Sequence, residues 1–196
     1  LLFAIPAHAR AFEDRAGRAY WAMLALMAQA IPFVAAFSVA KADFSDLGWG
    51  ITSALLVLPA SFIAWRWRQA ASRIDQVTQV ASAALAAAFA WLALTHILPN
   101  DYFASVTLAI AAALAAWATR TSGEGMQKLA AVPAGFGIFA LLVGSWQFLD
   151  ALFEALGGDQ LMLSELPELR DAAKLTLLPA GLASATALLP RFALGR

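Results

Sequence analysis

Residues 76–119 of this chain read QVTQVASAALAAAFAWLALTHILPNDYFASVTLAIAAALAAWAT. Two apolar runs, 76–98 and 102–119, flank the break Pro99-Asn100-Asp101, and neither run contains Asp, Glu, Lys or Arg. As helices that rise about 1.5 Å per residue they are about 27–35 Å long, which matches a bilayer core of about 30 Å. A soluble helix of this length would need a polar face, and neither run has one. The segment therefore predicts a transmembrane hairpin.

The composition of the whole chain agrees with that prediction. Apolar residues make up 62% and charged residues 13%, against about 45–50% and about 25% in ordinary soluble chains. The mean hydropathy is +0.72. The net charge is zero and there are no cysteines. A nucleic-acid partner is not expected, because it would need a clustered basic excess. Because there are no cysteines, the chain cannot form disulfides, thiolate metal sites or cysteine nucleophiles.

The fold class predicted is an all-α, polytopic transmembrane helical bundle that forms one region over residues 1–196. Tyr20 and Trp21 are the aromatic anchors expected at the edge of a span. Residues 1–7 resemble the end of a further helix, so we expect the chain to be a fragment of a longer protein and to pack with spans outside it. Six complete spans are expected, at about 20–40, 49–65, 76–98, 102–119, 129–149 and 172–189.

Prolines lie inside several of these spans. Pro32 indicates a kinked helix or, alternatively, a broken helix that lines a substrate cavity. A helix over 167–189 is expected to have Pro167 at its first position, to become the sixth span, and to be broken or bent around residues 179–181. In the third span, Ser82, Ala86 and Ala90 form a row of small residues that is expected to face another helix at close range.

Lys and Arg alternate between the connectors. Ten of the thirteen lie in connectors 8–18, 66–75, 120–128 and 190–196, and three lie in the intervening connectors. Nine of the thirteen acids lie in the intervening connectors, and four lie in the first set. The positive-inside rule places the first set of connectors in the cytoplasm. The chain is therefore expected in the bacterial cytoplasmic membrane, with lipid as its surroundings.

Residues 146–171 are too polar to cross the membrane. The longest charge-free apolar stretch between 158 and 171 is short, Leu161 to Leu163, whereas a span needs about 20 residues. The fifth span is expected to continue as an amphipathic helix to Gly157-Gly158 and to cover the outer end of the bundle like a lid. Its apolar stripe consists of Phe148, Leu149, Leu152, Phe153 and Leu156, with Asp150 and Glu154 off the stripe.

Motifs for catalysis are not found. The two histidines, His8 and His96, do not form an H-E-x-x-H pair, and no P-loop or G-x-S-x-G motif occurs. We expect His8 to be solvated, His96 to sit near the headgroups at the end of its span, and Lys174 to extend towards the interface. No catalytic, cofactor-binding or metal-binding residue is assigned from the sequence, and no cofactor is expected.

The acids of the outer connectors leave two function classes open. The first is a membrane module without chemistry of its own, a scaffold or a transporter-like unit. The second is an enzyme of the glycosyltransferase type that uses lipid-linked sugars and places acids in its outer loops. The acids in question are Asp43, Asp46, Asp101, Asp150, Glu154, Asp159, Glu165, Glu168 and Asp171. The same distribution also arises when basic residues are simply excluded from the outer connectors, so the sequence favours the non-enzymatic module.

The Arg-rich turn at 66–73 and the Pro190-Arg191 ending separate densely spaced spans rich in Ala, Leu and Trp. In this overall texture the chain resembles long bacterial membrane proteins of a domain-of-unknown-function family. The resemblance implies an integral membrane protein of which this chain is one portion. It assigns no functional residues.

Overall fold

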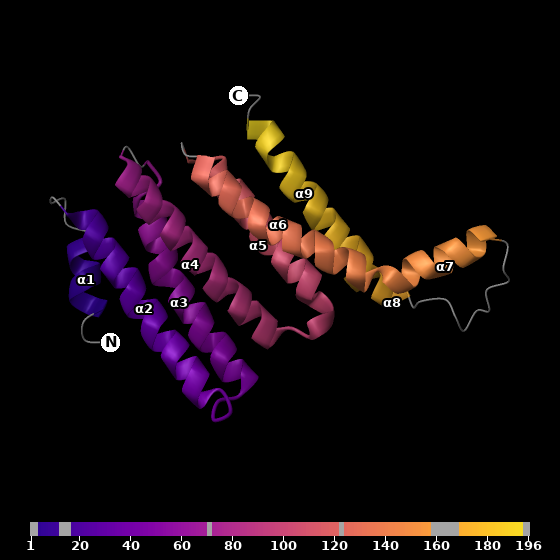
Figure 1. The fold of residues 1–196 in the computed structure, drawn as a ribbon, viewed down its shortest axis with the longest axis horizontal. Helices are drawn as coiled ribbons and strands as arrows, with labels where there is room; N and C mark the ends of the chain where they lie inside the picture. Colours follow the sequence, from indigo (N-terminus) through magenta and orange to yellow (C-terminus); the bar gives the residue numbers. More distant parts are fainter. Residues whose placement is uncertain (1–3, 12–16, 70–71, 122–123, 158–168, 194–196) are drawn as a thin grey trace. The chain divides into compact units, whose positions relative to one another are not determined.

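The computed structural model describes residues 4–11, 17–69, 72–121, 124–157 and 169–193. Every regular element in these ranges is helical, which confirms the predicted all-α class (Figure 1). The chain divides into two compact units. Unit 1 contains Leu1–Ile97 with Arg120–Leu129, and unit 2 contains Leu98–Thr119 with Ala130–Arg196.

Five helices are long and apolar enough to cross a membrane, and each overlaps one of the first five predicted spans. They are α2 (Arg18–Ala40), α3 (Asp46–Arg66), α4 (Arg73–Ile97), the short 3-10 turn η1 (Asn100–Tyr102) with α5 (Phe103–Ala118), and α6 (Glu124–Gly144). The sixth predicted span falls in a helical segment built from α8 (Leu169–Ala172), the π-helical turn η2 (Ala173–Leu177) and α9 (Leu178–Ala193). Its apolar part, Ala173–Leu188, is shorter than the other five, so six complete spans remain a prediction.

Unit 1 is an up-and-down arrangement of α2, α3 and α4. At one end the Arg18 guanidinium lies over the Trp67 ring, 5.7 Å from its centroid. At the other end the rings of Phe37 and His96 meet edge to face at 5.8 Å. The start of α2 thus lies beside the end of α3, and the end of α2 lies beside the end of α4. This pairing is what alternating membrane crossings require.

Small residues bring the helices of unit 1 together. Ser82 and Ala86 are buried, and Ala86 belongs to a core cluster that includes Ala22, Ala25 and Ala60. The expectation that this face of α4 contacts another helix is confirmed at these two positions. In lipid, such close approach is the usual source of helix packing, because the lipid tails remove the hydrophobic drive between helices.

Unit 2 packs α9 against α5 and α6 against α5. The α6 helix approaches α5 closely at Gly137, where a Cβ atom would lie 2.5 Å from Cγ of Leu108 and 3.2 Å from the Leu108 backbone nitrogen. Leu108 is fully buried, so it has little room to move. Gly137 is therefore a glycine because α5 leaves no space for a side chain.

The helix boundaries differ from the predicted spans where polar residues belong to a first turn. The α4 helix begins at Arg73 and not near Gln76, because Ser72 caps it: the Asp75 backbone N–H donates to Ser72 Oγ at 3.2 Å. Likewise α6 begins at Glu124 and not near Leu129, with Glu124 and Lys128 paired one turn apart. An acid in the first turn interacts favourably with the helix dipole. Much of the predicted connector 120–128 is therefore helical.

The fifth span does not continue as a single helix, as was predicted. The α6 helix ends at Gly144, before the predicted end at 149, and α7 (Trp146–Gly157) begins after a turn at Ser145. The helix does reach Gly157 as expected. Among the described residues of its apolar stripe, Phe148 and Leu149 are half-buried, whereas Phe153 and Leu156 are 65% and 75% exposed. Packing of the stripe on other helices, as expected of a lid, is therefore limited to its N-terminal part. Position 152 of the stripe and the residues that follow 157 up to 168 lie outside the described side chains, so Pro167 is not described either.

The polar connector predicted at 8–18 is shorter than expected. Helix α1 (Ala4–Ala11) extends into it, with Ala7 and Ala11 almost completely buried in the core of unit 1. His8 is consequently not solvated as expected. It is partly buried and is hydrogen-bonded to the Gln29 side chain of α2. Ala7 and Ala11 are four residues apart and so lie on one face of α1, the helix that packs against α2, and His8 lies next to Ala7.

Candidate functional site

The candidate site of unit 2 is built on the π-helical turn η2. A π turn contains one more residue than an α turn and commonly occurs at functional positions. Here the backbone N–H of Leu178 donates to the Ala173 carbonyl, five residues earlier. The turn therefore interrupts the regular α-helical pattern at Lys174, one turn before Pro179.

Pro179 explains why the irregularity lies at residues 173–177 and not around 179–181, as expected from the sequence. Proline has no backbone N–H, so one helical donor is missing for the carbonyls four and five residues earlier, Leu175 and Lys174. Both accept from serine hydroxyls instead. Ser145 Oγ donates to the Leu175 carbonyl at 3.3 Å and Ser105 Oγ to the Lys174 carbonyl at 3.5 Å. The helix is thereby held to α5 and to the α6–α7 turn.

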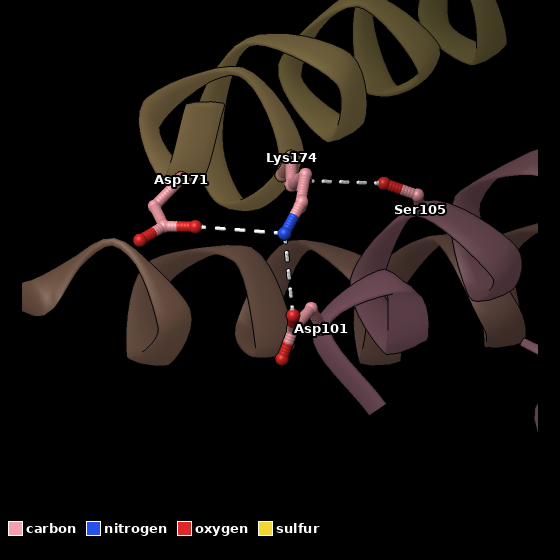
Figure 2. Close-up of polar contacts among 4 residues, drawn as sticks. All are labelled: Asp101, Ser105, Asp171 and Lys174. Carbon is pink, nitrogen blue, oxygen red and sulfur yellow. Dashed lines mark hydrogen bonds and ion pairs between the residues drawn. The ribbon is translucent and has the colours of Figure 1, made fainter. Parts of the chain in front are cut away.

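The Lys174 ammonium lies between two aspartates (Figure 2). Its Nζ is 3.5 Å from Asp101 Oδ2 and 3.5 Å from Asp171 Oδ1. The Lys174 side chain is 16% exposed, whereas Asp101 and Asp171 are 57% and 46% exposed. The sequence placed Lys174 towards the interface without naming a partner, and the structure adds two carboxylates of unit 2 as its counter-charge. Formally, this Lys174 cluster of three side chains carries one net negative charge.

An apolar cleft of about 480 Å³ adjoins the cluster. Asn100 and Asp101 are its polar lining residues. The others are Phe103, Ala104, Phe136, Phe139, Ala140, Val143, Gly144 and Leu175. The Phe136 and Phe139 side chains are more than 60% exposed. The cleft is therefore a groove on the surface of unit 2 with a carboxylate among its lining residues.

The remaining outer acids do not join this cluster. Asp150 and Glu154 are exposed on α7, and within the described part of unit 2 the structure shows no ion pair for either. Asp43 and Asp46 belong to unit 1. Asp159, Glu165 and Glu168 lie outside the described residues. Of the nine acids considered from the sequence, the structure thus brings together Asp101 and Asp171.

The histidines have structural partners. His96 lies in the last turn of α4, where its Nδ1 is 2.8 Å from the Leu92 carbonyl and its ring packs on Phe37. This position near a helix end is the one expected. His8 contacts Gln29, as described above. Over the described residues, no group of three His, Asp or Glu side chains is arranged to hold a metal ion.

Sequence reasoning missed the roles of Ser105, Ser145 and Thr176. Ser145 Oγ also lies 3.1 Å from Thr176 Oγ1, and Ser145 is 6% exposed. The available signal was Pro179, whose missing N–H implies that a carbonyl at 174 or 175 needs another donor. Hydroxyl side chains in the neighbouring helices were the candidates to supply them.

Comparison with known proteins adds no family assignment. No protein-family model, no curated protein and no solved structure matches this chain. The class of the protein thus follows from the helices themselves: five of them are long and apolar enough to cross a membrane, which indicates an integral membrane protein.

Proposed function

We propose that this chain is a six-span helical scaffold of the bacterial cytoplasmic membrane without a reaction of its own. In this proposal connectors 8–18, 66–75, 120–128 and 190–196 face the cytoplasm. The basic residues support this orientation, and the contacts at the two ends of unit 1 support the alternation of the helices. The weak resemblance to long, many-span bacterial proteins is consistent with a module that packs against further helices.

The observation that carries the proposal is the pairing of Lys174 with Asp101 and Asp171. An ion-coupled carrier keeps a charge in the apolar region so that a transported ion or a substrate can neutralise it. Here the chain neutralises its own lysine, and one of the two acids comes from the connector between α4 and α5. Together with the two serine bonds, the ion pairs act as a clamp that joins η1, α5 and the α6–α7 turn to α8 and η2.

The orientation is tested by single cysteines, because the chain has none of its own. Ser72→Cys and Ser122→Cys should be protected from an impermeant thiol reagent in intact cells, while Asp159→Cys should react. Permeabilised cells provide the control, since all three positions should then react. Labelling at Ser72 with protection at Asp159 would reverse the proposed orientation.

An enzyme of the glycosyltransferase type is the second candidate. It is favoured by one observation, the meeting of Asp101 and Asp171 beside an apolar cleft that could hold part of a lipid-linked substrate. The test uses purified protein with a polyprenyl-phosphate sugar and a peptide or sugar acceptor. The scaffold predicts no consumption of the donor. Consumption by the wild type that is lost in Asp101→Asn, at unchanged folded yield, would replace the scaffold with the enzyme.

A further inference from the structure

We propose that the cleft of unit 2 binds phosphatidylethanolamine, with an acyl chain along the apolar walls and the headgroup ammonium against Asp101. This inference rests on the proposed membrane embedding, and it adds a specific lipid site to it.

The walls of the cleft suit an acyl chain. Eight of its ten lining residues carry no polar side chain, and they come from α5, α6 and η2. Phe136, Phe139 and Val143 follow one another on a single side of α6, at a spacing of three and four residues, and remain exposed in unit 2. A volume of about 480 Å³ lies within the range of about 300–1,000 Å³ typical of small-molecule sites. A space of this size can hold one flexible chain.

The polar lining residues select the headgroup. Asn100 and Asp101 form the turn before α5, and the two oxygens of the Asp101 carboxylate have different surroundings. Lys174 engages Oδ2, and no described residue is paired with Oδ1. With one net negative charge over Asp101, Asp171 and Lys174, the cluster attracts a cationic group and repels an anionic lipid. A primary ammonium can also donate to Oδ1, and such charge-assisted hydrogen bonds are the stronger kind.

The depth of these groups also matches a phospholipid. Asn100 and Asp101 stand at the start of the helix that spans from Asn100 to Ala118, where the polar headgroup region begins. The apolar walls extend from there along α5 and α6. A lipid whose ammonium contacts Asp101 therefore places its acyl chain beside Phe139 and Ala140.

The test places a fluorescent probe inside and outside the cleft. Ala140→Cys lines the cleft, whereas Leu142→Cys lies two residues further along α6, is exposed and is not a lining residue. Each variant of the full chain is labelled with bimane and reconstituted in phosphatidylcholine vesicles. A small fraction of dibrominated phosphatidylethanolamine or dibrominated phosphatidylglycerol is then added, because bromine quenches bimane at contact.

At position 140 we expect brominated phosphatidylethanolamine to quench at about one tenth of the phosphatidylglycerol concentration, which corresponds to about 1.4 kcal/mol. At position 142 the two lipids should quench equally. The preference at 140 should disappear in Asp101→Asn and persist in Asp43→Asn, an exposed outer acid of unit 1. Circular dichroism and size-exclusion chromatography verify that each variant is folded.

Equal quenching by both lipids at position 140 in the folded wild-type background would overturn the site, and so would a preference for phosphatidylglycerol. A preference that survives in Asp101→Asn would remove the carboxylate from the mechanism and also overturn the proposal. If Asp101→Asn does not fold, dibrominated phosphatidylcholine replaces it as the comparison: its quaternary ammonium has no N–H donor, so it should quench more weakly than phosphatidylethanolamine. Failure of the membrane proposal is distinct, because the probe at 142 would then not be quenched by any lipid.

Discussion

Replacing Lys174 by methionine should destabilise unit 2 measurably. Methionine keeps most of the aliphatic stem and removes the charge, so that Asp101 and Asp171 face each other without a cation. At 3.5 Å from each carboxylate, a unit charge gains about 5 kcal/mol per pair at an effective dielectric constant of about 20. Because both acids are about half exposed, solvent screening and desolvation of the ammonium reduce this gain, and we expect a net loss of about 1–3 kcal/mol.

The matched control is Lys128→Met. Lys128 pairs with Glu124 at 3.4 Å, a similar distance, but both side chains are about 80% exposed or more. Surface pairs of this kind contribute about 0.5 kcal/mol or less. The assay is reversible unfolding in mixed micelles, monitored by circular dichroism. In the double variant Lys174→Met/Asp101→Asn, part of the loss should be recovered, because one of the two facing carboxylates is neutral. Equal effects of Lys174→Met and Lys128→Met would refute the clamp.

Three further predictions concern packing and the π turn. Gly137→Ala should lower the free energy of unfolding by about 1–3 kcal/mol through overpacking against Leu108. Gly135→Ala, with open space at its Cβ, should instead raise it by about 0.5–1 kcal/mol. The opposite order in the unfolding assay would contradict the close approach of α5 and α6. Ala86→Leu should lower the free energy of unfolding by about 1–3 kcal/mol, also through overpacking. Ala88 is exposed on the same helix, so Ala88→Leu should stay within about 0.5 kcal/mol of the wild type. Equal effects would show that the face of α4 that contains Ala86 does not pack against another helix. Ser145→Ala should lower the free energy of unfolding by about 1–3 kcal/mol, because it leaves the Leu175 carbonyl unpaired. The loss should be smaller in a Pro179→Ala background, where a backbone N–H can replace the hydroxyl. Strictly additive effects of the two substitutions would refute the proposed connection between Ser145 and Pro179.

The long helices could be predicted because a bilayer imposes a simple requirement on sequence. Runs of about 20 residues without charge are rare in soluble chains, and the five longest here all became helices of spanning length. Their ends were less predictable. Ser72 to Asp75 look like a polar connector, yet they cap and begin α4, since a helix continues past the hydrocarbon edge when its first turn is satisfied by its own side chains.

The candidate site could be predicted only in part, because it depends on contacts between distant segments. The acids of the outer connectors were recognisable as a group, but the pairing of Asp101 with Lys174 requires η1 and η2 to be neighbours. Pro179 was recognised as a source of irregularity and was placed at the centre of the bend. Its effect appears upstream instead, because the donor that proline lacks would have served carbonyls one turn earlier.

The π turn at Ala173–Leu177 is equivalent to a single residue inserted into an α-helix. Each residue of a helix advances the direction of the side chains by about 100°. The insertion therefore gives the two ends of this helix different rotational settings: Asp171 and Lys174 can point towards η1, while the later turns keep their own apolar face against α5. If one residue were deleted here, the helix could not both direct Asp171 and Lys174 towards η1 and keep the apolar face of its later turns against α5. Deleting one residue from this segment should therefore destabilise the protein more than substituting one.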